Sequence, residues 1–491
     1  MDSRYRQAGI AMLLGLALVL VEAPAWAAAE VGSVGYTRGV LTGQIEGEPV
    51  RILGKGQPLR AGETLKTGSR SFALIRLNDG TRMTLRPNSA FRIEDVNTKK
   101  GEESALMRLI KGGFRAITGF ISKRRPGAFK VTTSVATIGI RGTEFDTRLC
   151  EGDECAQENA AIGEPAKDES RVIGRVALLR GKASAVDGAD KTRPLSTGAA
   201  VYESDRLQTG IQSFAVIAFN DESRVTMSPN TVFRIEQHRY RPDTPKESNA
   251  FLRFIRGGLR LVTGLIGKLN RPSWRVGTPT ATIGIRGTGF DLVCDGECVD
   301  QQAAHFDPWR QTLAGRLLGQ FLQPVYAQQR AGMYARVWKG EIVLQYDGGS
   351  TILAEGQTAF MRNSRSAPRL LPDLPRHLRG FGGAPRPDKV VITRDLFAKA
   401  SPGGVPPGLY VSVREGDVTV RGKDGSMALL GRGEASLTGL DGNTQRLAFV
   451  PPFQKYDETP LPDELTPRMR RMLDLFGVKG RKKKAFQCRL Q

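Results

Sequence analysis

Two copies of one short phrase carry residues whose types could do chemistry: ATIGIRGTEFD at 136–146 and ATIGIRGTGFD at 281–291. The GIRGT part of each copy has a hydroxyl, on Thr143 or Thr288, and a hydroxyl nucleophile needs a base within hydrogen-bond reach. No histidine occurs in both repeats, and the chain has three: His238, His305 and His377. We therefore interpret the phrase as scaffold and not as a catalytic site.

Paired carboxylates would offer a second kind of chemistry, in which one group acts as acid and the other as base or nucleophile. The two candidate pairs are Asp79 with Glu94 and Asp221 with Glu236. Asp79 lies in the run Asn78-Asp79-Gly80, however, and Asp in such a run shapes a turn through its own backbone contacts. The sequence also lacks a GxxxxGK[S/T] phosphate loop. We expect no enzymatic activity and no cofactor.

Four of the five cysteines form close pairs after the repeated phrase: Cys150 with Cys155, and Cys294 with Cys298. Two cysteines around a short acidic turn are typical of a small local disulfide in an oxidising compartment. Zinc is the alternative, because thiolates at this spacing can share a metal, but neither loop supplies the remaining ligands. We expect two loop disulfides and no metal, with Cys488 unpaired or intermolecular.

The duplication extends well beyond the phrase. Residues 65–94 align without a gap on residues 207–236, and LIKGGFRAITG at 109–119 matches FIRGGLRLVTG at 254–264. The chain of 491 residues is also too long for one ordinary core. We predict two copies of a domain, at 31–155 and 173–298.

Each copy shows the pattern of β-strands. Apolar residues occur at near-alternate positions on both sides of the Asn78-Asp79-Gly80 run, which is a hairpin signal. Gly139 and Gly142 would let a strand bend or another backbone approach closely. Thr143 fits a strand edge and Phe145 a core position. The sequence predicts a mainly β fold of tandem domains built from short strands and hairpins.

The rest of the chain divides by composition. A strand-turn-strand unit found near the start of both repeats recurs twice after residue 332, which predicts β-hairpin regions at 333–363 and 409–450. Apolar residues at helical spacing predict an amphipathic helix at 305–330 that packs on protein or lies on a membrane surface. A Pro- and Arg-rich linker is expected at 366–389, and a basic tail at 475–491.

The repeated motifs resemble those of the FecR-domain family of bacterial envelope proteins. The shared positions are T-G, D-G, P-N-S, G-G-x-R and R-G-T-x-F. The residues that carry the last motif and the hairpin turn are Asp79, Gly80, Asp221, Arg141, Gly142, Thr143, Phe145, Arg286, Gly287, Thr288 and Phe290. Both copies together cover roughly half of the chain, and their completeness makes the resemblance specific.

The resemblance implies a sensing or protein-interaction module. The best-known members of the family relay the occupancy of an outer-membrane iron-siderophore receptor to an extracytoplasmic sigma factor. In this chain the apolar run begins at about residue 8, without a preceding cytoplasmic helical segment, and no later run could span a bilayer. We therefore carry over the domain and not the direct control of a sigma factor.

The N-terminal residues 1–27 have the form of a cleaved secretory signal. Arg4 and Arg6 precede the apolar run AGIAMLLGLALVLV, and small residues follow it around the expected cleavage after Ala27. The expected location is periplasmic or secreted, with no transmembrane span after cleavage. Export takes a chain of net charge +22 away from most nucleic acid. We expect instead an envelope protein, or an anionic polymer or lipid head group, as partner.

These observations favour a non-enzymatic envelope protein that binds or signals. A structural surface protein or adhesin is the alternative. A secreted polysaccharide-processing enzyme is a further one, but with 4 Trp and 9 Tyr the chain offers few aromatic platforms for sugar rings. The sequence does not settle the oligomeric state.

Peptide mapping without reduction should find both loops closed, Cys150 to Cys155 and Cys294 to Cys298. Closing so short a loop removes little chain entropy, so reduction should lower the melting temperature only slightly. A Cys150–Cys294 link, or stoichiometric zinc in the purified chain, would contradict the prediction.

Overall fold

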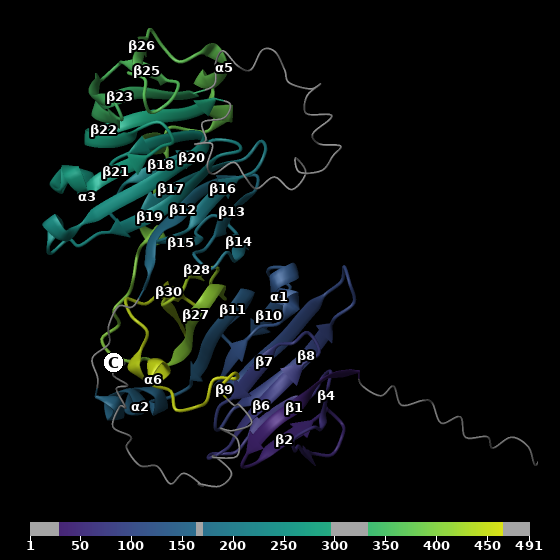
Figure 1. Cartoon of the computed structure of the whole chain (residues 1–491). Helices are drawn as coiled ribbons and strands as arrows, with labels where there is room; N and C mark the ends of the chain where they lie inside the picture. Colours follow the sequence, from purple (N-terminus) through teal and green to yellow (C-terminus); the bar gives the residue numbers. More distant parts are fainter. Residues whose placement is uncertain (1–28, 164–169, 296–331, 465–491) are drawn as a thin grey trace, which may run out of the picture.

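The computed structural model describes residues 29–163, 170–295 and 332–464, which form two β lobes (Figure 1). The mainly β fold predicted from the sequence is confirmed. Buried and half-buried residues alternate along the first half of β8 (Ala90–Asn97). In β6 (Phe72–Leu77) and β17 (Phe214–Phe219), by contrast, nearly every residue is buried. No helix in these three ranges is long and apolar enough to cross a membrane.

The first repeat supplies eleven strands and two helices. They are β1 (Glu30–Arg38), β2 (Leu41–Gln44), β3 (Arg51–Ile52), β4 (Pro58–Arg60), β5 (Thr64–Thr67), β6, β7 (Arg82–Leu85), β8 (Ala90–Asn97), β9 (Ser104–Ile117), α1 (Phe120–Arg124), β10 (Phe129–Thr132), β11 (Ala136–Cys150) and α2 (Glu154–Ile162).

The second repeat has the same succession of strands. They are β12 (Val172–Arg180), β13 (Ala183–Val186), β14 (Thr192–Pro194), β15 (Ala200–Tyr202), β16 (Arg206–Thr209), β17, β18 (Arg224–Met227), β19 (Val232–Arg239), β20 (Asn249–Val262), α3 (Leu265–Leu269), β21 (Trp274–Gly277) and β22 (Thr282–Asp295).

The segment after the second repeat completes the second sheet. Its strands are β23 (Gly332–Tyr346), β24 (Gly349–Ala354), β25 (Thr358–Met361) and β26 (Arg369–Leu371). β23 pairs antiparallel with β22, from Thr282 opposite Gln345 to Asp295 opposite Gly332. The sheet order is β14-β13-β16-β19-β20-β21-β22-β23-β25-β26.

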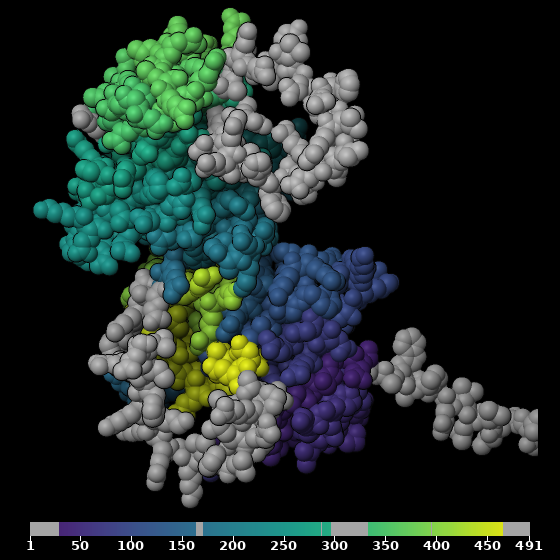
Figure 2. Space-filling model, viewed as in Figure 1, coloured from purple at the N-terminus to yellow at the C-terminus, as the bar shows by residue number. Residues whose placement is uncertain are grey.

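The last strands return to the first repeat, about 260 residues back along the chain. They are β27 (Gly408–Gly422), β28 (Met427–Leu430), β29 (Ala435–Gly439) and β30 (Thr444–Arg446), followed by α6 (Pro452–Lys455). β27 pairs antiparallel with β11, from Ala136 opposite Gly422 to Cys150 opposite Gly408. In Figure 2 these yellow residues share one lobe with the purple and blue N-terminal strands.

The domain boundaries at 31–155 and 173–298 therefore leave out part of each sheet. Val411, Val418 and Val420 of β27 belong to the first core, and Val337, Ile342 and Leu344 of β23 belong to the second. Apolar alternation identified both hairpin regions as β material but could not say which sheet each joins, because pairing between distant strands leaves no local signal.

The segment predicted as a Pro- and Arg-rich linker, 366–389, is packed against the second lobe. It contains β26 and α5 (Arg376–Arg379), and its apolar residues Leu374, Phe381 and Ala384 are buried against Phe214, Val293 and Tyr334. Arg260 donates to the Ala384 carbonyl at 3.2 Å. The breakers in this sequence mark turns of a packed segment and not a free connection.

Three predicted segments lie outside the described residues: the signal peptide at 1–27, the amphipathic helix at 305–330, and the basic tail at 475–491. Their predicted structures stay predictions.

A charge placed at a matched position of each added strand should destabilise one lobe and spare the other. Val418 lies opposite Ile140, and Ile342 lies opposite Ile285, and all four side chains are buried. Val418→Asp should cost the first lobe about 3 kcal/mol, because an uncompensated carboxylate enters an apolar core. Hydrogen exchange should show lost protection in β9 and β11.

Ile342→Asp is the matched control and should affect β20 and β22 instead. Unchanged protection of β11 in the Val418→Asp chain would mean that β27 does not complete the first sheet.

Candidate functional site

The R-G-T motif lies at a β-bulge in both long strands. Pairing of β11 with β27 shifts between Arg141 and Glu144, and pairing of β22 with β23 shifts between Arg286 and Gly289. Gly142 and Gly287 have φ of +65° and +70°, a region that side-chain-bearing residues rarely adopt. The motif glycine thus makes the bend that redirects the strand, as its type suggested.

The motif hydroxyls have no base. Thr143 is buried, and its backbone N–H donates to Thr118 Oγ1 at 2.9 Å, while Thr288 makes the equivalent bond to Thr263 at 3.0 Å. Among the described residues neither threonine Oγ1 has a hydrogen-bond partner. A nucleophile would need such a partner to be activated.

The motif phenylalanines belong to the two cores. Phe145 and Phe290 are fully buried. The Phe145 ring meets Phe114 edge-on at 5.7 Å between centroids, and Phe290 meets Trp274 at 6.4 Å. These residues fill space and position the strand, and they present no surface to a ligand.

The predicted carboxylate pairs are not brought together. Asp79 accepts from Thr81, from its backbone N–H and from its hydroxyl, both at 2.9 Å, next to Gly80 with φ of +83°. Glu94 instead forms an ion pair with Arg108 at 2.7 Å. Asp79 therefore closes the turn that its neighbours indicated, and Glu94 pairs with Arg108 across β8 and β9 instead.

The second copy repeats this arrangement with one addition. Asp221 accepts from Ser223 and lies 3.3 Å from Nε2 of the buried His238, and Glu236 pairs with Arg253 at 2.7 Å. Burial acts to raise the pKa of Asp221, but the contacts with His238 and Ser223 outweigh it and hold that pKa below its ordinary value.

A pair of buried ions that the sequence analysis missed joins two of the repeated motifs. Arg115 of G-G-x-R lies 2.8 Å from Asp146, the last residue of the R-G-T phrase, and Arg414 of β27 holds the other carboxylate oxygen at 2.9 Å. In the second lobe Arg260 lies 3.2 Å from Asp291, which also accepts from Trp338 Nε1 at 3.0 Å. The arginine and the aspartate of this pair occur at matching positions in both repeats, and this repetition is the sequence signal that could have identified the pair.

The two lobes meet at a polar interface that we call the seam, formed by Arg141, Arg175, Lys191, Ser196, Tyr202, Glu415, Arg432 and Glu434. Arg175 of β12 and Glu434 of the first lobe form an ion pair, with side chains 1% and 2% exposed. Arg175 also donates to the carbonyls of Gly198 and Leu429, at 2.9 and 3.2 Å. The ion pair is thus almost fully buried and has polar partners from both lobes.

Further hydrogen bonds extend the seam. The motif residue Arg141 donates to Ser196 Oγ at 2.8 Å, and the Arg432 backbone N–H donates to the Tyr202 hydroxyl at 2.7 Å. Lys191 reaches Glu415 at 2.5 Å at the exposed rim. The R-G-T motif of the first copy therefore contributes directly to the contact with the second lobe. The side chain of Arg286 is not described.

Burial perturbs the titration of several groups near the seam. It raises the pKa of Asp205 to about 6, against the attraction of Arg193, and it also raises the pKa of Asp417. It lowers the pKa of Arg446, beside Glu434, to about 10. The common cause is desolvation where the two lobes exclude water.

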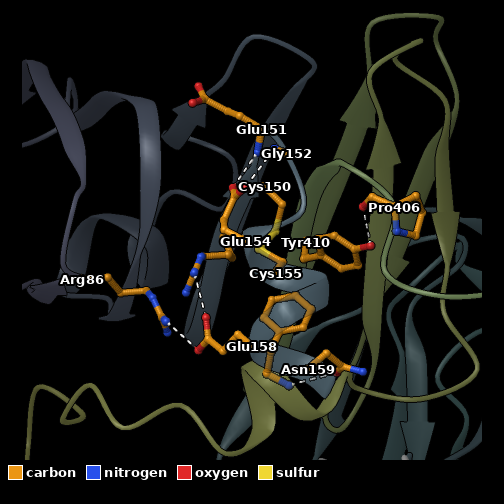
Figure 3. The surroundings of a disulfide bond; sticks show 12 residues. Arg86, Cys150, Glu151, Gly152, Glu154, Cys155, Glu158, Asn159, Pro406 and Tyr410 are labelled. Carbon is orange, nitrogen blue, oxygen red and sulfur yellow. Dashed lines mark hydrogen bonds and ion pairs between the residues drawn. A yellow bond between two sulfur atoms is a disulfide. The ribbon is translucent and has the colours of Figure 1, made fainter. Parts of the chain in front are cut away.

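A disulfide fixes the end of β11. Cys150 is bonded to Cys155 with a Cα–Cα distance of 5.9 Å, as predicted, which leaves no free thiolate for zinc in this loop. Figure 3 shows Tyr410 beside the bond, and Glu158 of α2 facing Arg86. Glu158 also accepts from Arg148 at 2.8 Å. Cys294 is also disulfide-bonded, and Cys298 lies outside the described residues, so the second pairing stays a prediction.

Comparison with known proteins identifies the repeated unit. Residues 63–160 and 205–305 match the family described as FecR protein. Each matched region runs from β5 or β16 through the R-G-T motif and includes the bulged strand. The chain thus carries two tandem FecR-like domains, as the sequence motifs predicted.

The comparisons with individual proteins are less informative. No curated protein matches the chain. Two crystal structures of a candidate anti-sigma factor from Parabacteroides distasonis, at 1.65 and 2.50 Å resolution, are 10% identical, with TM-scores of 0.21 and 0.22. The match covers 34% of this chain and 57% of those chains. TM-scores of this size do not establish a common fold.

Alanine at the bulge should destabilise the first lobe, whereas alanine three residues earlier should not. A Cβ at Gly142 would be held at a left-handed φ, at a cost of about 1–2 kcal/mol. A Cβ at Gly139 would meet no atom closer than the Thr419 carbonyl oxygen at 3.9 Å. Urea unfolding of the two variants measures the difference. Equal stabilities would show that the bulge is not required.

Removal of the seam arginine should unfold the junction. Arg175→Met leaves the buried Glu434 without its main partner and should cost about 3 kcal/mol. Arg180→Met, at an exposed end of the same strand, is the control and should be nearly neutral. The double variant Arg175→Met/Glu434→Leu should cost less than the sum of the two single changes. Additive losses in denaturant titrations would refute direct coupling across the seam.

Proposed function

We propose that this chain is a non-enzymatic signalling or regulatory protein of the bacterial cell envelope, whose tandem FecR-like domains bind a protein or an anionic component there. The observation that carries the proposal is that the residues of the repeated motifs have structural roles. In both copies the glycine, threonine, phenylalanine and aspartate of R-G-T-x-F-D serve the bulge, the core and a buried ion pair. The aspartate carboxylates are held by arginines of the scaffold, and the threonine and phenylalanine side chains are buried.

The match to the FecR family supports a signalling or regulatory role, and the predicted signal peptide supports an envelope location. The net charge of +22 supports an anionic partner, because attraction over a basic surface speeds encounter. Specific recognition would then come from loops, pockets or strand edges of the two sheets.

A structural surface protein remains the alternative, and it differs in one measurable respect. A signalling protein binds a partner saturably, whereas a structural protein needs no such equilibrium. An enzyme with paired carboxylates would need Asp79 or Asp221 to face a substrate, and both side chains are buried in turns.

Affinity capture should test the proposal directly. The tagged chain, incubated with envelope extract of its own cells, should retain a partner saturably, and retention should fall as salt rises because screening shortens to about 3 Å at 1 M. A parallel panel of glycan, ester and peptide substrates should show no turnover. Turnover that is abolished by Asp79→Asn would establish an enzyme, and the absence of any saturable partner would leave the structural alternative.

A further inference from the structure

A pocket of about 790 Å³ lies at the junction of the two lobes. Its walls come from β27, from the turn before β29, from the segment 450–456 that contains α6, and from Arg171 at the start of the second lobe. The volume is in the range of small-ligand sites. Arg432 lines the pocket and also contacts Tyr202 of the second lobe through its backbone, so the pocket adjoins the seam.

The lining is strongly cationic. Arg171, Arg414, Arg432 and Lys455 face Asp146, the one acidic residue of the lining. That carboxylate is already held by Arg115 and by Arg414 through its Nε. Convergent guanidinium groups favour carboxylate or phosphate, which they bind with paired hydrogen bonds.

Gln454 gives a second and independent indication. Its side chain is 3% exposed and lines the pocket, and within the described ranges neither its Nε2 nor its Oε1 has a hydrogen-bond partner. A buried amide without partners is costly, and such groups are normally paired. A simple anion could accept from Nε2 but could donate nothing to Oε1, whereas a hydroxyl can donate to Oε1 and also accept from Nε2.

We infer that this pocket binds an acidic oligosaccharide. Its carboxylate or phosphate group is held by the arginines, and its hydroxyls pair with the Gln454 amide. The inference rests on the proposed function, for which it specifies the class of envelope component. Because the walls come from both lobes, an occupant would also tie Arg171 to the first lobe.

Calorimetric titration of the purified chain at low salt tests the inference with three probes. Trigalacturonate and glucose 6-phosphate supply a carboxylate and a phosphate on a sugar, and maltotriose is the neutral control. We expect one of the acidic probes to bind with about one ligand per chain and maltotriose not to bind. The acidic probe that binds more tightly shows whether the pocket prefers a carboxylate or a phosphate on the sugar.

Two variants assign the binding to this pocket. Gln454→Met keeps the size of the side chain but removes both polar atoms, so affinity should fall about tenfold while the melting temperature is kept or raised. Arg171→Gln should weaken binding by a similar factor. Lys130→Gln, an equal charge change on the exposed face of β10, should leave affinity within about twofold.

Binding of neither acidic probe would overturn the inference, and so would equal affinity of the Gln454→Met and original chains. An acidic peptide that binds this pocket in place of both sugars would overturn it as well. Envelope capture by the Gln454→Met chain separates the two claims: capture that persists while sugar binding is absent refutes the oligosaccharide and leaves the proposed function standing.

Discussion

The antiparallel pairing of β11 with β27 is the interaction on which the first lobe depends. The two strands are paired from Ala136 opposite Gly422 to Cys150 opposite Gly408, with two register shifts, one on either side of Glu144, at the R-G-T motif. Val418 and Val420 thereby enter the first core. The pairing also carries Arg414, Arg432 and Glu434 to the face that meets the second lobe, because these residues lie on β27 or between its neighbours β28 and β29. The seam and the cationic pocket both follow from this one return of the chain.

The buried ion pair across the seam has a different role from the apolar cores. Arg175 and Glu434 are almost fully withdrawn from water, and an ion pair in such surroundings recovers little more than the desolvation cost of its members. The ion pair makes other arrangements of the two lobes less stable, because each of them would leave a buried charge without its partner.

Much of the fold followed from local patterns. The repeats, the hairpin at Asp79 and the Cys150–Cys155 bond have short-range signals in residue type and spacing. No short-range signal shows which sheet β23 or β27 joins, because apolar alternation indicates a strand but not its pairing partner. The Arg115–Asp146 pair could have been found, since both residues recur in both repeats. The pocket could not have been predicted from the sequence, because Arg171, Gln454 and Arg432 are brought together only when the last strands pair with the first sheet.

Photo-crosslinking within the chain tests the central claim most directly, which is that the last strands complete the first sheet. Benzoylphenylalanine at Thr137 of β11 would lie opposite Arg421 of β27. After irradiation of the dilute, purified chain, the account predicts an intramolecular cross-link between peptides that contain residues 137 and 421. Cross-links that instead join residue 137 to the second lobe, or to another copy of the chain, would contradict it.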